Sequence, residues 1–407
     1  MTGTLPLAGC RVIDLSHVMA GPVCTLLLAD LGAEVIKVER PPGGDDSRRM
    51  GPPFLDGESA AFLMMNRNKR GIALDLKTEA GRAALGRLIA GADVLVENYR
   101  RGTMEKLGLG WETLRRRHPG LIYCAISGFG RSGPLADHGG FDLMAQALSG
   151  IMSVTGEGPG RPPVKCGPPV TDITAGLLAA LGIAAAYARR QRSGEGGLVD
   201  TSLYEAGIMH SFWQSAICLA TGRSPQPMGS AHPLNAPYQA FATADGWLAV
   251  GAANQRNWLR LTEALERPDL AADPRFADNL ARMTHLAALE EALTPLFAAR
   301  STADWLARLE AAGVPAAPVR SIGEMLEAPQ TLARDMVIEV DHAALGPVKS
   351  LGTPVKIDGR TRPGRRGAPR LGADTAAVLA EAGFTAAEIA TLLAEGAALQ
   401  AAPPGKP

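Results

Sequence analysis

The first half of the chain alternates short apolar runs, rich in β-branched residues, with longer stretches whose apolar positions repeat at the helical period. The apolar runs predict five strands, at residues 11–15, 34–38, 71–76, 93–97 and 121–127. Periodic segments between several of them, such as residues 79–90, predict helices. This alternation is typical of βαβ units, so we expect an α/β fold with a mostly parallel, doubly wound sheet.

The pattern changes further along the chain. A long helix is expected over 171–190, with Asp172 in its first turn, followed by a strand at 198–201 and a helix to about residue 220. A hairpin at 239–250 and later helices then indicate a second, smaller α+β domain. These later helices are expected at residues 257–266, 280–299 and 302–312. Residues 321–367 are predicted to form an irregular connection, and helices return at 374–382 and 385–395.

Composition and charge narrow the class of protein. Hydrophobic residues make up 46% of the 407, and 47 Gly and 30 Pro are spread along the chain, which fits a globular protein. The 41 basic and 41 acidic residues cancel, so we expect no nucleic-acid partner. Five scattered cysteines without CxxC spacing predict thiols in a reducing compartment and no metal site.

Two further features predict a cytoplasmic protein without a membrane partner. The N-terminal MTGTLPLAGC lacks the basic and apolar regions of a signal peptide. The longest run of low polarity, residues 175–188, is shorter than a membrane span requires.

One stretch of the chain, residues 66–118, carries twelve basic residues against six acidic ones. Several of these basic residues fall at predicted strand ends and in loops, where they could bind phosphate. Solvated helix faces would give the same pattern, and the sequence alone leaves both interpretations open.

Three motifs could carry chemistry. Gly128, Gly130 and Gly133 form a GxGxxG match after a predicted strand, but Pro134 delays any helix, which favours a structural turn over a dinucleotide site. The loop containing His17 follows the first strand and leads into a helix, where α/β folds place ligands. Asp172 begins the long helix, so its spacing alone favours a helix-capping role over catalysis.

The sequence as a whole resembles the class III CoA-transferases, the group that contains formyl-CoA transferase, carnitine CoA-transferase and, as a relative, α-methylacyl-CoA racemase. The resemblance covers nearly the whole chain. It rests on RVIDLSHVMAGPVCTLLLADLGAEVIKVERP, NRNKRGIALDLKTEAG, ADVLVENYRRGTMEKLGLGWETL, GFGRSGP with GFDLMAQALSG, DITAGLLAALGIAAAY and GGLVDTSLYEA.

This resemblance implies a large Rossmann-like domain built from both ends of the chain, a small α+β domain inserted in it, and an intertwined homodimer. The implied boundaries are 1–202 for the first part of the large domain, 203–227 for a linker, 228–325 for the small domain, 326–354 for a second linker and 355–407 for the part that completes the large domain.

The resemblance also implies an enzyme with covalent catalysis. Asp172 matches the catalytic aspartate of the family, which would attack a donor acyl-CoA, with succinyl-CoA or a similar short acyl-CoA expected, and pass coenzyme A to a carboxylic acid through aspartyl anhydride and aspartyl-CoA thioester intermediates. The CoA thioester would be a substrate, and no tightly bound cofactor is expected. The positions that match CoA-binding residues are His17, Val18, Met19, Ala20, Arg40, Leu74, Asp75, Leu76, Lys77, Asn98, Tyr99, Arg100 and Lys106.

Two departures from the family bear on the substrate. The segment GSAHPLNAPYQAF stands where formyl-CoA transferase has a glycine-rich loop, which argues against a formyl/oxalyl substrate pair. Phe141 stands where racemase-like members have a catalytic histidine, and an apolar ring cannot carry a proton. Candidates for binding the acceptor's second carboxylate are His232, Asn235, Arg48 and Arg49.

Two alternatives to CoA transfer remain open at this point. One is an acyl-CoA α-epimerase or racemase, which would exchange the α-proton of a bound thioester with solvent. The other is a non-catalytic CoA-binding protein, whose affinity for CoA would survive replacement of Asp172.

Overall fold

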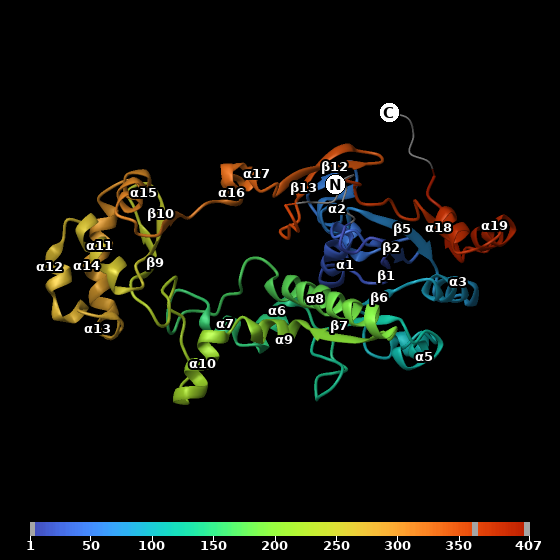
Figure 1. Ribbon diagram of the computed structural model, residues 1–407, viewed down its shortest axis with the longest axis horizontal. Helices are drawn as coiled ribbons and strands as arrows, with labels where there is room; N and C mark the ends of the chain where they lie inside the picture. Colours follow the sequence, from blue (N-terminus) through green and yellow to red (C-terminus); the bar gives the residue numbers. More distant parts are fainter. Residues whose placement is uncertain (1–4, 360–364, 403–407) are drawn as a thin grey trace. The chain divides into compact units, whose positions relative to one another are not determined.

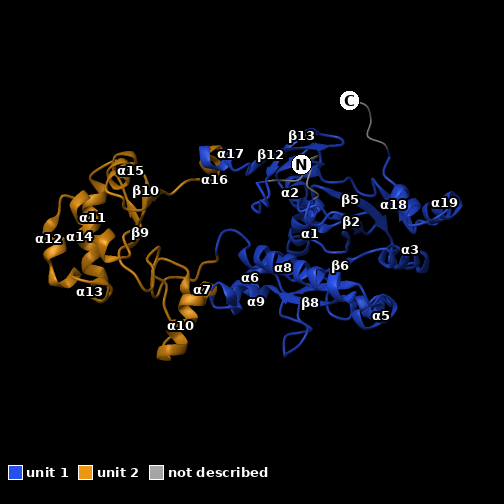
Figure 2. Cartoon of the chain, viewed as in Figure 1, with its two compact units in different colours: residues 1–150, 166–210, 329–407 blue, residues 151–165, 211–328 orange. Residues whose placement is uncertain are grey.

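A computed structural model describes residues 5–359 and 365–402. These residues form two compact units, which are coloured separately in Figure 2. Unit 1 comprises residues 1–150, 166–210 and 329–407, and unit 2 comprises residues 151–165 and 211–328. Residues 1–4, 360–364 and 403–407, which fall within the first and last predicted domain segments, lie outside the described residues. The finer domain and linker boundaries stay a prediction.

Unit 1 is built on a seven-stranded sheet with the order β14-β5-β2-β1-β6-β7-β8, in which only the pairing of β14 with β5 is antiparallel. The mostly parallel α/β sheet that the hydrophobic pattern predicts is thus confirmed. The strands are β1 (Arg11–Asp14), β2 (Glu34–Glu39), β5 (Lys69–Leu74), β6 (Val94–Glu97), β7 (Ile122–Ser127), β8 (Gly197–Ser202) and β14 (Ala398–Leu399).

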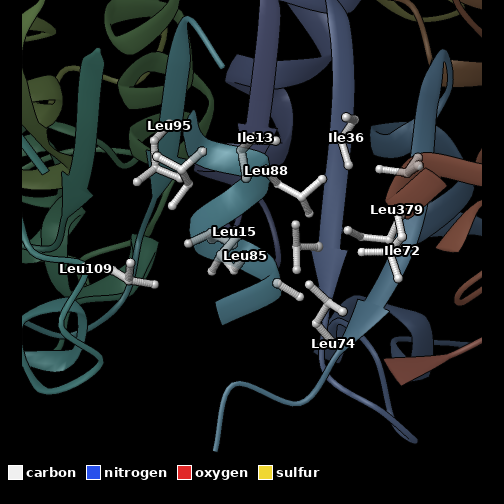
Figure 3. Packing of buried hydrophobic residues seen from close by; sticks show 14 of the residues in the cluster. Ile13, Leu15, Ile36, Ile72, Leu74, Leu85, Leu88, Leu95, Leu109 and Leu379 are labelled. Carbon is white, nitrogen blue, oxygen red and sulfur yellow. The ribbon is translucent and has the colours of Figure 1, made fainter. Parts of the chain in front are cut away.

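Helices cover both faces of this sheet because its strands are apolar on both sides. Ile13, Ile36 and Leu95 point to the face covered by α3, and Figure 3 shows Leu85 and Leu88 of that helix among them. Val12 and Val35, one residue earlier in their strands, belong to the opposite core with α1 and α8. The first layer includes α3 (Glu79–Ala90), α5 (Trp111–Arg117), α18 (Thr375–Glu381) and α19 (Ala386–Ala394), and the second includes α1 (Ala20–Asp30), α8 (Val170–Ser193) and α9 (Leu203–Met209).

Helix α8 is longer and more apolar than its neighbours. By length and composition its 24 residues could cross a membrane, contrary to the estimate from the sequence. Core helices meet the same criterion, and Ala175, Ala179 and Ile183 of α8 are buried in the core that it shares with α1. Leu177 and Leu181 on another side of the helix are exposed.

Several short elements of unit 1 complete its loops and edges. They are the 3₁₀ turn Asp46–Arg49, β3 (Phe54–Leu55), β4 (Glu58–Ser59), α2 (Ala60–Asn66), α4 (Thr103–Lys106), α6 (Asp142–Leu148) and α17 (Pro329–Ala333).

The predicted irregular connection at 321–367 is wrong in part. It contains α16 (Ile322–Glu327) and a hairpin of β12 (Val337–His342) and β13 (Gly346–Leu351). In β12, buried positions alternate with half-buried or exposed ones, as expected for a strand with one covered face. This alternation was the signal in the sequence, and the many Gly, Pro and Arg residues around it obscured it.

Unit 2 has a three-stranded antiparallel sheet, β11-β10-β9, packed against helices. The predicted hairpin is confirmed as β9 (Tyr238–Ala242) and β10 (Trp247–Gly251), to which β11 (Ala316–Pro318) adds. Two predicted helices are each divided, the one over 280–299 at His285 and the one before residue 220 between α9 and α10. The helices and 3₁₀ turn of unit 2 are α7 (Ile151–Val154), α10 (Phe212–Thr221), α11 (Gln255–Ala264), α12 (Pro268–Ala272), the turn Pro274–Phe276, α13 (Asn279–Thr284), α14 (Leu286–Ala298), α15 (Thr302–Ala311) and α16.

Figure 1 shows the course of the chain from the sheet of unit 1 through the helices of unit 2 and back. The returning segment adds β14 beside β5 and packs α18 and α19 against the α3 face. Both ends of the chain therefore build the large sheet.

Candidate active site

A cavity of about 500 Å³ in unit 1 lies where β1, β6 and β7 end. In the sheet, β1 lies between β2 and β6, so the strand order changes direction at this point. Open α/β sheets bind ligands at such switch points, outside the carboxyl ends of the strands. The lining includes Asp172 from the first turn of α8 and the loop that follows β1.

The loop after β1 holds a strained conformation. Val18 has a φ of 64°, in the left-handed region that β-branched residues rarely adopt, and its N–H donates to Asp45 Oδ1 at 3.0 Å. Asn98, just after β6, fixes the neighbouring residue by two bonds, since it accepts from His17 N at 2.8 Å and donates to His17 O at 2.9 Å. These hydrogen bonds fix the backbone of His17 and Val18, and they hold Val18 in its strained conformation.

Buried charged side chains hold this loop in place. Asp14 and Lys37 are register partners on β1 and β2, on the face covered by α1, and both are fully buried. Lys37 Nζ contacts Asp45 Oδ2 at 2.9 Å and donates to Ser16 O at 2.8 Å. Although burial alone would raise it, the lysine lowers the pKa of Asp45 below the usual carboxyl range.

The carboxylate of Asp14 is held in the same way. Lys69 Nζ lies 3.1 Å from it, and Thr25 donates to it at 2.6 Å. Burial opposes ionisation, but the two lysines lower the pKa of Asp14 to about 2. Burial lowers the pKa of Lys69 to about 8.

Asp172 has the opposite surroundings. Burial, and then the charge of Asp142, raise the pKa of Asp172 to about 6. Among the residues that the structure describes, none donates a hydrogen bond to its carboxylate or forms an ion pair with it. A helix N-terminus favours the charged form of a carboxylate, but burial and the neighbouring acid outweigh this effect at Asp172.

The opposite wall of the cavity is made by two glycine-containing loops in contact. A Cβ on Gly140 would lie 2.6 Å from Cα of Gly128, so the loop after β7 and the loop before α6 meet only because both residues are glycine. No helix follows the GxGxxG match directly, since α6 begins at Asp142. The motif therefore forms a turn that shapes the cavity, as the sequence favoured.

Of the predicted residues, nine line this one cavity: His17, Val18, Met19, Ala20, Arg40, Asn98, Tyr99, Arg100 and Asp172. Five do not line it: Leu74, Asp75, Leu76, Lys77 and Lys106. Leu74 is buried at the end of β5, and Asp75 faces another cavity, of about 580 Å³, beside Pro41 and Leu399. Whether these five contact CoA stays a prediction.

The remaining lining residues were not predicted to bind CoA. They are Asp46, Arg101, Ile126, Ser127, Gly128, Ala136, His138, Gly139, Gly140, Phe141 and Leu203. Ile126 and Ser127 end β7 and Gly128 follows it, so the rule that ligands lie at the carboxyl ends of strands could have found them. The loop residues 136–141 carry no such signal.

The basic residues of 66–118 divide between structural and exposed roles. Arg67 bonds to the buried Asp30, and Arg70 bonds to Glu34 and Glu381. Only Arg100 and Arg101 of the twelve line the cavity, and Arg100 has no ion pair among the described residues. The phosphate-binding interpretation therefore rests on these two, together with Arg40 from outside the stretch.

The candidates for an acceptor carboxylate have other partners. Arg48 makes two bonds to Glu39, at 2.7 Å each, and its guanidinium lies over the ring of Phe62. Arg49 bonds to Gly43 O and Asp46. His232 and Asn235 lie in unit 2, where the His232 ring packs edge-on against Trp213 and Tyr238.

The assembled cavity can place an anion and a nucleophile in one space. Arg40, Arg100 and Arg101 supply positive charge suited to phosphate, and Asp172 supplies a carboxylate of raised basicity with free lone pairs. Burial and Lys37 lower the pKa of His17, so this lining side chain is neutral at pH 7.

Comparisons with known proteins identify the family. The chain matches the sequence model of CoA-transferase family III over residues 7–375. It is 41% identical to a succinate–glutarate CoA-transferase of Agrobacterium fabrum, over 92% of this chain and 95% of that protein. It is 42% identical to a succinyl-CoA:mesaconate CoA-transferase of Haloarcula hispanica, over 92% and 95%.

The fold leads to the same family. A crystal structure of a CaiB/BaiF family protein from Brucella suis superposes with a TM-score of 0.82 at 40% identity, covering 93% of this chain and 100% of that one. With the sequence match over residues 7–375, these comparisons show that the chain belongs to CoA-transferase family III and is a CoA-transferase.

Proposed function

We propose that this enzyme transfers coenzyme A from succinyl-CoA to a small dicarboxylic acid, with Asp172 as the nucleophile. The observation that carries the proposal is the position of Asp172, which lines the cavity, has raised basicity and forms no ion pair with any residue that the structure describes. The relatives named for glutarate and mesaconate support a dicarboxylate acceptor.

The proposed reaction proceeds by acyl exchange in four steps. The Asp172 carboxylate attacks the thioester carbonyl of succinyl-CoA, forming a mixed anhydride and releasing CoA thiolate. The thiolate attacks the aspartyl carbonyl, so that succinate leaves and an aspartyl-CoA thioester remains. The acceptor carboxylate then attacks this thioester and again releases the thiolate, which takes the acceptor's acyl group and regenerates Asp172.

The arginines of the cavity have a binding role in this proposal. CoA carries its phosphates far from its sulfur, so a site needs cations apart from the nucleophile. Arg40 and Arg101 each have an acidic partner, Asp46 and Asp137 respectively, whereas Arg100 has none among the described residues. Arg100 is therefore the cation most available for a phosphate.

Trapping the covalent intermediate tests the mechanism. Incubation with succinyl-CoA followed by hydroxylamine should convert Asp172 to its hydroxamate, which peptide mass spectrometry locates. The control is Asp172→Asn, which has no carboxylate to form the anhydride and should give no hydroxamate. An active enzyme whose Asp172 stays unmodified would overturn the proposed nucleophile.

An acceptor panel tests the substrate class. We expect C4 and C5 dicarboxylic acids, with glutarate and mesaconate first, to give the highest kcat/KM, and acetate and butyrate to give far lower values. Equal rates with monocarboxylic acids would contradict the dicarboxylate assignment.

Proton exchange at the α-carbon is expected to be absent. Phe141, which lines the cavity, is 72% exposed and has no group that can carry a proton. Incubation of the enzyme with succinyl-CoA in D₂O, without an acceptor, should leave the α-carbon unlabelled.

We also propose that two copies of the chain associate and intertwine. Helix α10 has no buried residue, and Phe212, Trp213 and Leu219 on it are 66%, 56% and 88% exposed. Apolar groups of this size are normally covered by a partner. Light scattering after gel filtration should give twice the chain mass of 42.5 kDa, and a monomer at micromolar concentration would contradict the proposal.

A further inference from the structure

The first turn of α8 has an unusual cap. The residue before the helix is Pro169, which supplies no side-chain hydrogen bond. Asp142, the first residue of α6, supplies the acceptor instead, since its Oδ1 receives the Thr171 N–H at 3.0 Å and the Thr171 hydroxyl at 2.7 Å. A free helix N–H next to the proposed nucleophile is thus satisfied from another helix.

A second connection joins the same two segments. Gln146, one turn along α6 and fully buried, donates through Nε2 to Asp142 Oδ2 at 2.7 Å. Its Oε1 accepts the Cys166 N–H at 2.8 Å, in the segment that leads into α8. Asp142 and Gln146 therefore hold both the approach to α8 and its first turn, in the residues that immediately precede Asp172.

The same arrangement presents a negative charge to Asp172. Three donor groups face the oxygens of Asp142, which suits an ionised carboxylate, and its charge adds to burial in raising the pKa of Asp172. The other charged or titratable groups in the cavity, or on β8 and α9 beside α8, are not causes of this shift. They are His17, Arg40, Asp46, Tyr99, Arg100, Arg101, His138, Asp200, Tyr204 and Glu205.

We propose that Asp142 and Gln146 are positioning residues for the nucleophile: they fix the first turn of α8 and set a second negative charge beside Asp172. The inference rests on the proposed function, in which Asp172 attacks the thioester. A carboxylate that faces another negative charge and receives no hydrogen bond keeps its lone pairs available and its basicity high, which favours nucleophilic attack.

The decisive variant is Asp142→Asn. The amide oxygen still accepts from Thr171, so the cap of α8 is preserved. The charge is removed together with the bond from Gln146 Nε2, because the new amide NH₂ is a donor and cannot accept it. We expect the acid limb of kcat/KM for succinyl-CoA to move to lower pH by about 0.5–1 unit. We also expect kcat on the plateau to fall several-fold while the KM for succinyl-CoA stays the same. A profile that superposes on the wild-type profile would overturn the inference.

A second variant keeps the test independent of the first. Gln146→Leu keeps the charge of Asp142 but removes the bonds to Asp142 and to Cys166 N, so kcat should fall several-fold while the acid limb moves less than in Asp142→Asn. A folded variant with the kcat of the wild type counts against the positioning role of Gln146.

The matched control is Asp374→Asn. Asp374 precedes α18 in the same unit and accepts from Gly71 N at 2.8 Å and from Arg366, but it does not line the cavity. Its replacement can lower the melting temperature without moving the acid limb.

Hydroxylamine trapping distinguishes a failure of the proposed function from a failure of the positioning role alone. If the wild type gives no Asp172 hydroxamate, the proposed function fails. If the wild type is trapped, Asp142→Asn leaves the acid limb unchanged and Gln146→Leu leaves kcat unchanged, only the inference about positioning fails.

Discussion

Two carboxylates of unit 1 show how differently one fold can treat the same chemical group. Asp45, beneath the loop after β1, is fully buried and contacts Lys37 at 2.9 Å, and its pKa is lowered. Asp172, across the cavity wall, faces Asp142, and its pKa is raised to about 6. A carboxylate that supports a structure is neutralised by a buried cation, whereas one kept for chemistry is left without such a partner.

The sharpest test of this contrast is Asp172→Asn. We expect a loss of kcat of about 10³-fold or more, because an amide cannot form the anhydride. The pKa of Asp172 is raised, so its charge destabilises the fold as pH rises through about 6. At pH 7 the variant should therefore be as stable as the wild type or more stable, by urea unfolding. A clear loss of stability would show that Asp172 is structural after all.

Asp45→Asn should have the opposite profile. It leaves the buried Lys37 without its nearest acid, so the free energy of unfolding should fall by about 3 kcal/mol at pH 7. Because the pKa of Asp45 is lowered, its contribution is present above the usual carboxyl pKa and is lost as pH falls below it. Urea unfolding at pH 7 and at pH 3 measures this, and the deficit should shrink at the lower pH.

Glu97 has surroundings that are intermediate between those of Asp45 and Asp172. It is buried at the end of β6, it accepts from Tyr99 N at 2.8 Å, and its nearest cation, Arg131, is 3.4 Å away. Burial raises its pKa from 4.5 to about 7. Glu97 in its protonated form contributes to the free energy of unfolding. This contribution is present below pH 4.5 and is lost as pH rises through about 7.

The variant Glu97→Gln removes this titration. Relative to the wild type, it should gain up to roughly 3 kcal/mol of unfolding free energy between pH 4.5 and 7, as followed by denaturant unfolding. A difference that is constant with pH would contradict a raised pKa for Glu97.

The smallest effect is expected for Gly140→Ala. This variant changes the contact between Gly128 and Gly140 in the cavity wall and alters neither Asp45 nor Asp172. The new Cβ would lie 2.6 Å from Gly128, so stability should fall by about 1–2 kcal/mol. The KM for succinyl-CoA should rise while the acid limb stays in place. Gly86→Ala in α3, where a Cβ meets nothing within 4 Å, is the matched control. It should leave the KM unchanged and raise stability by about 0.5–1 kcal/mol, because alanine favours the helix interior.

Much of this fold could be predicted from the sequence because its signals are local. The strands β1, β2, β5, β6 and β7 are short apolar runs, and α8 has a helical period and its own start and stop residues. The strand β12 was missed although its alternation was present, because surrounding Gly, Pro and Arg residues suggested a loop. The short β14 has only two residues and no pattern of its own.

The site was predicted less completely, for a different reason. His17 and Asn98 follow strand ends, and a rule about parallel sheets finds them. The roles of Arg48 and Arg100 differ only in their tertiary partners, since Arg48 binds Glu39 and Arg100 lines the cavity. The bonds between Asp142 and Thr171 join residues 29 apart in sequence, and no local pattern encodes them.

The pairing of β14 with β5 has a consequence for the synthesis of this protein. Residues 398 and 399 are translated long after residues 73 and 74, yet they pair with them. A nascent chain that has already produced β5 and all of unit 2 still exposes the edge of its large sheet until β14 has emerged. Such an edge can pair with other chains. The ribosome-bound chain is therefore the stage at which we expect this enzyme to depend most on chaperones.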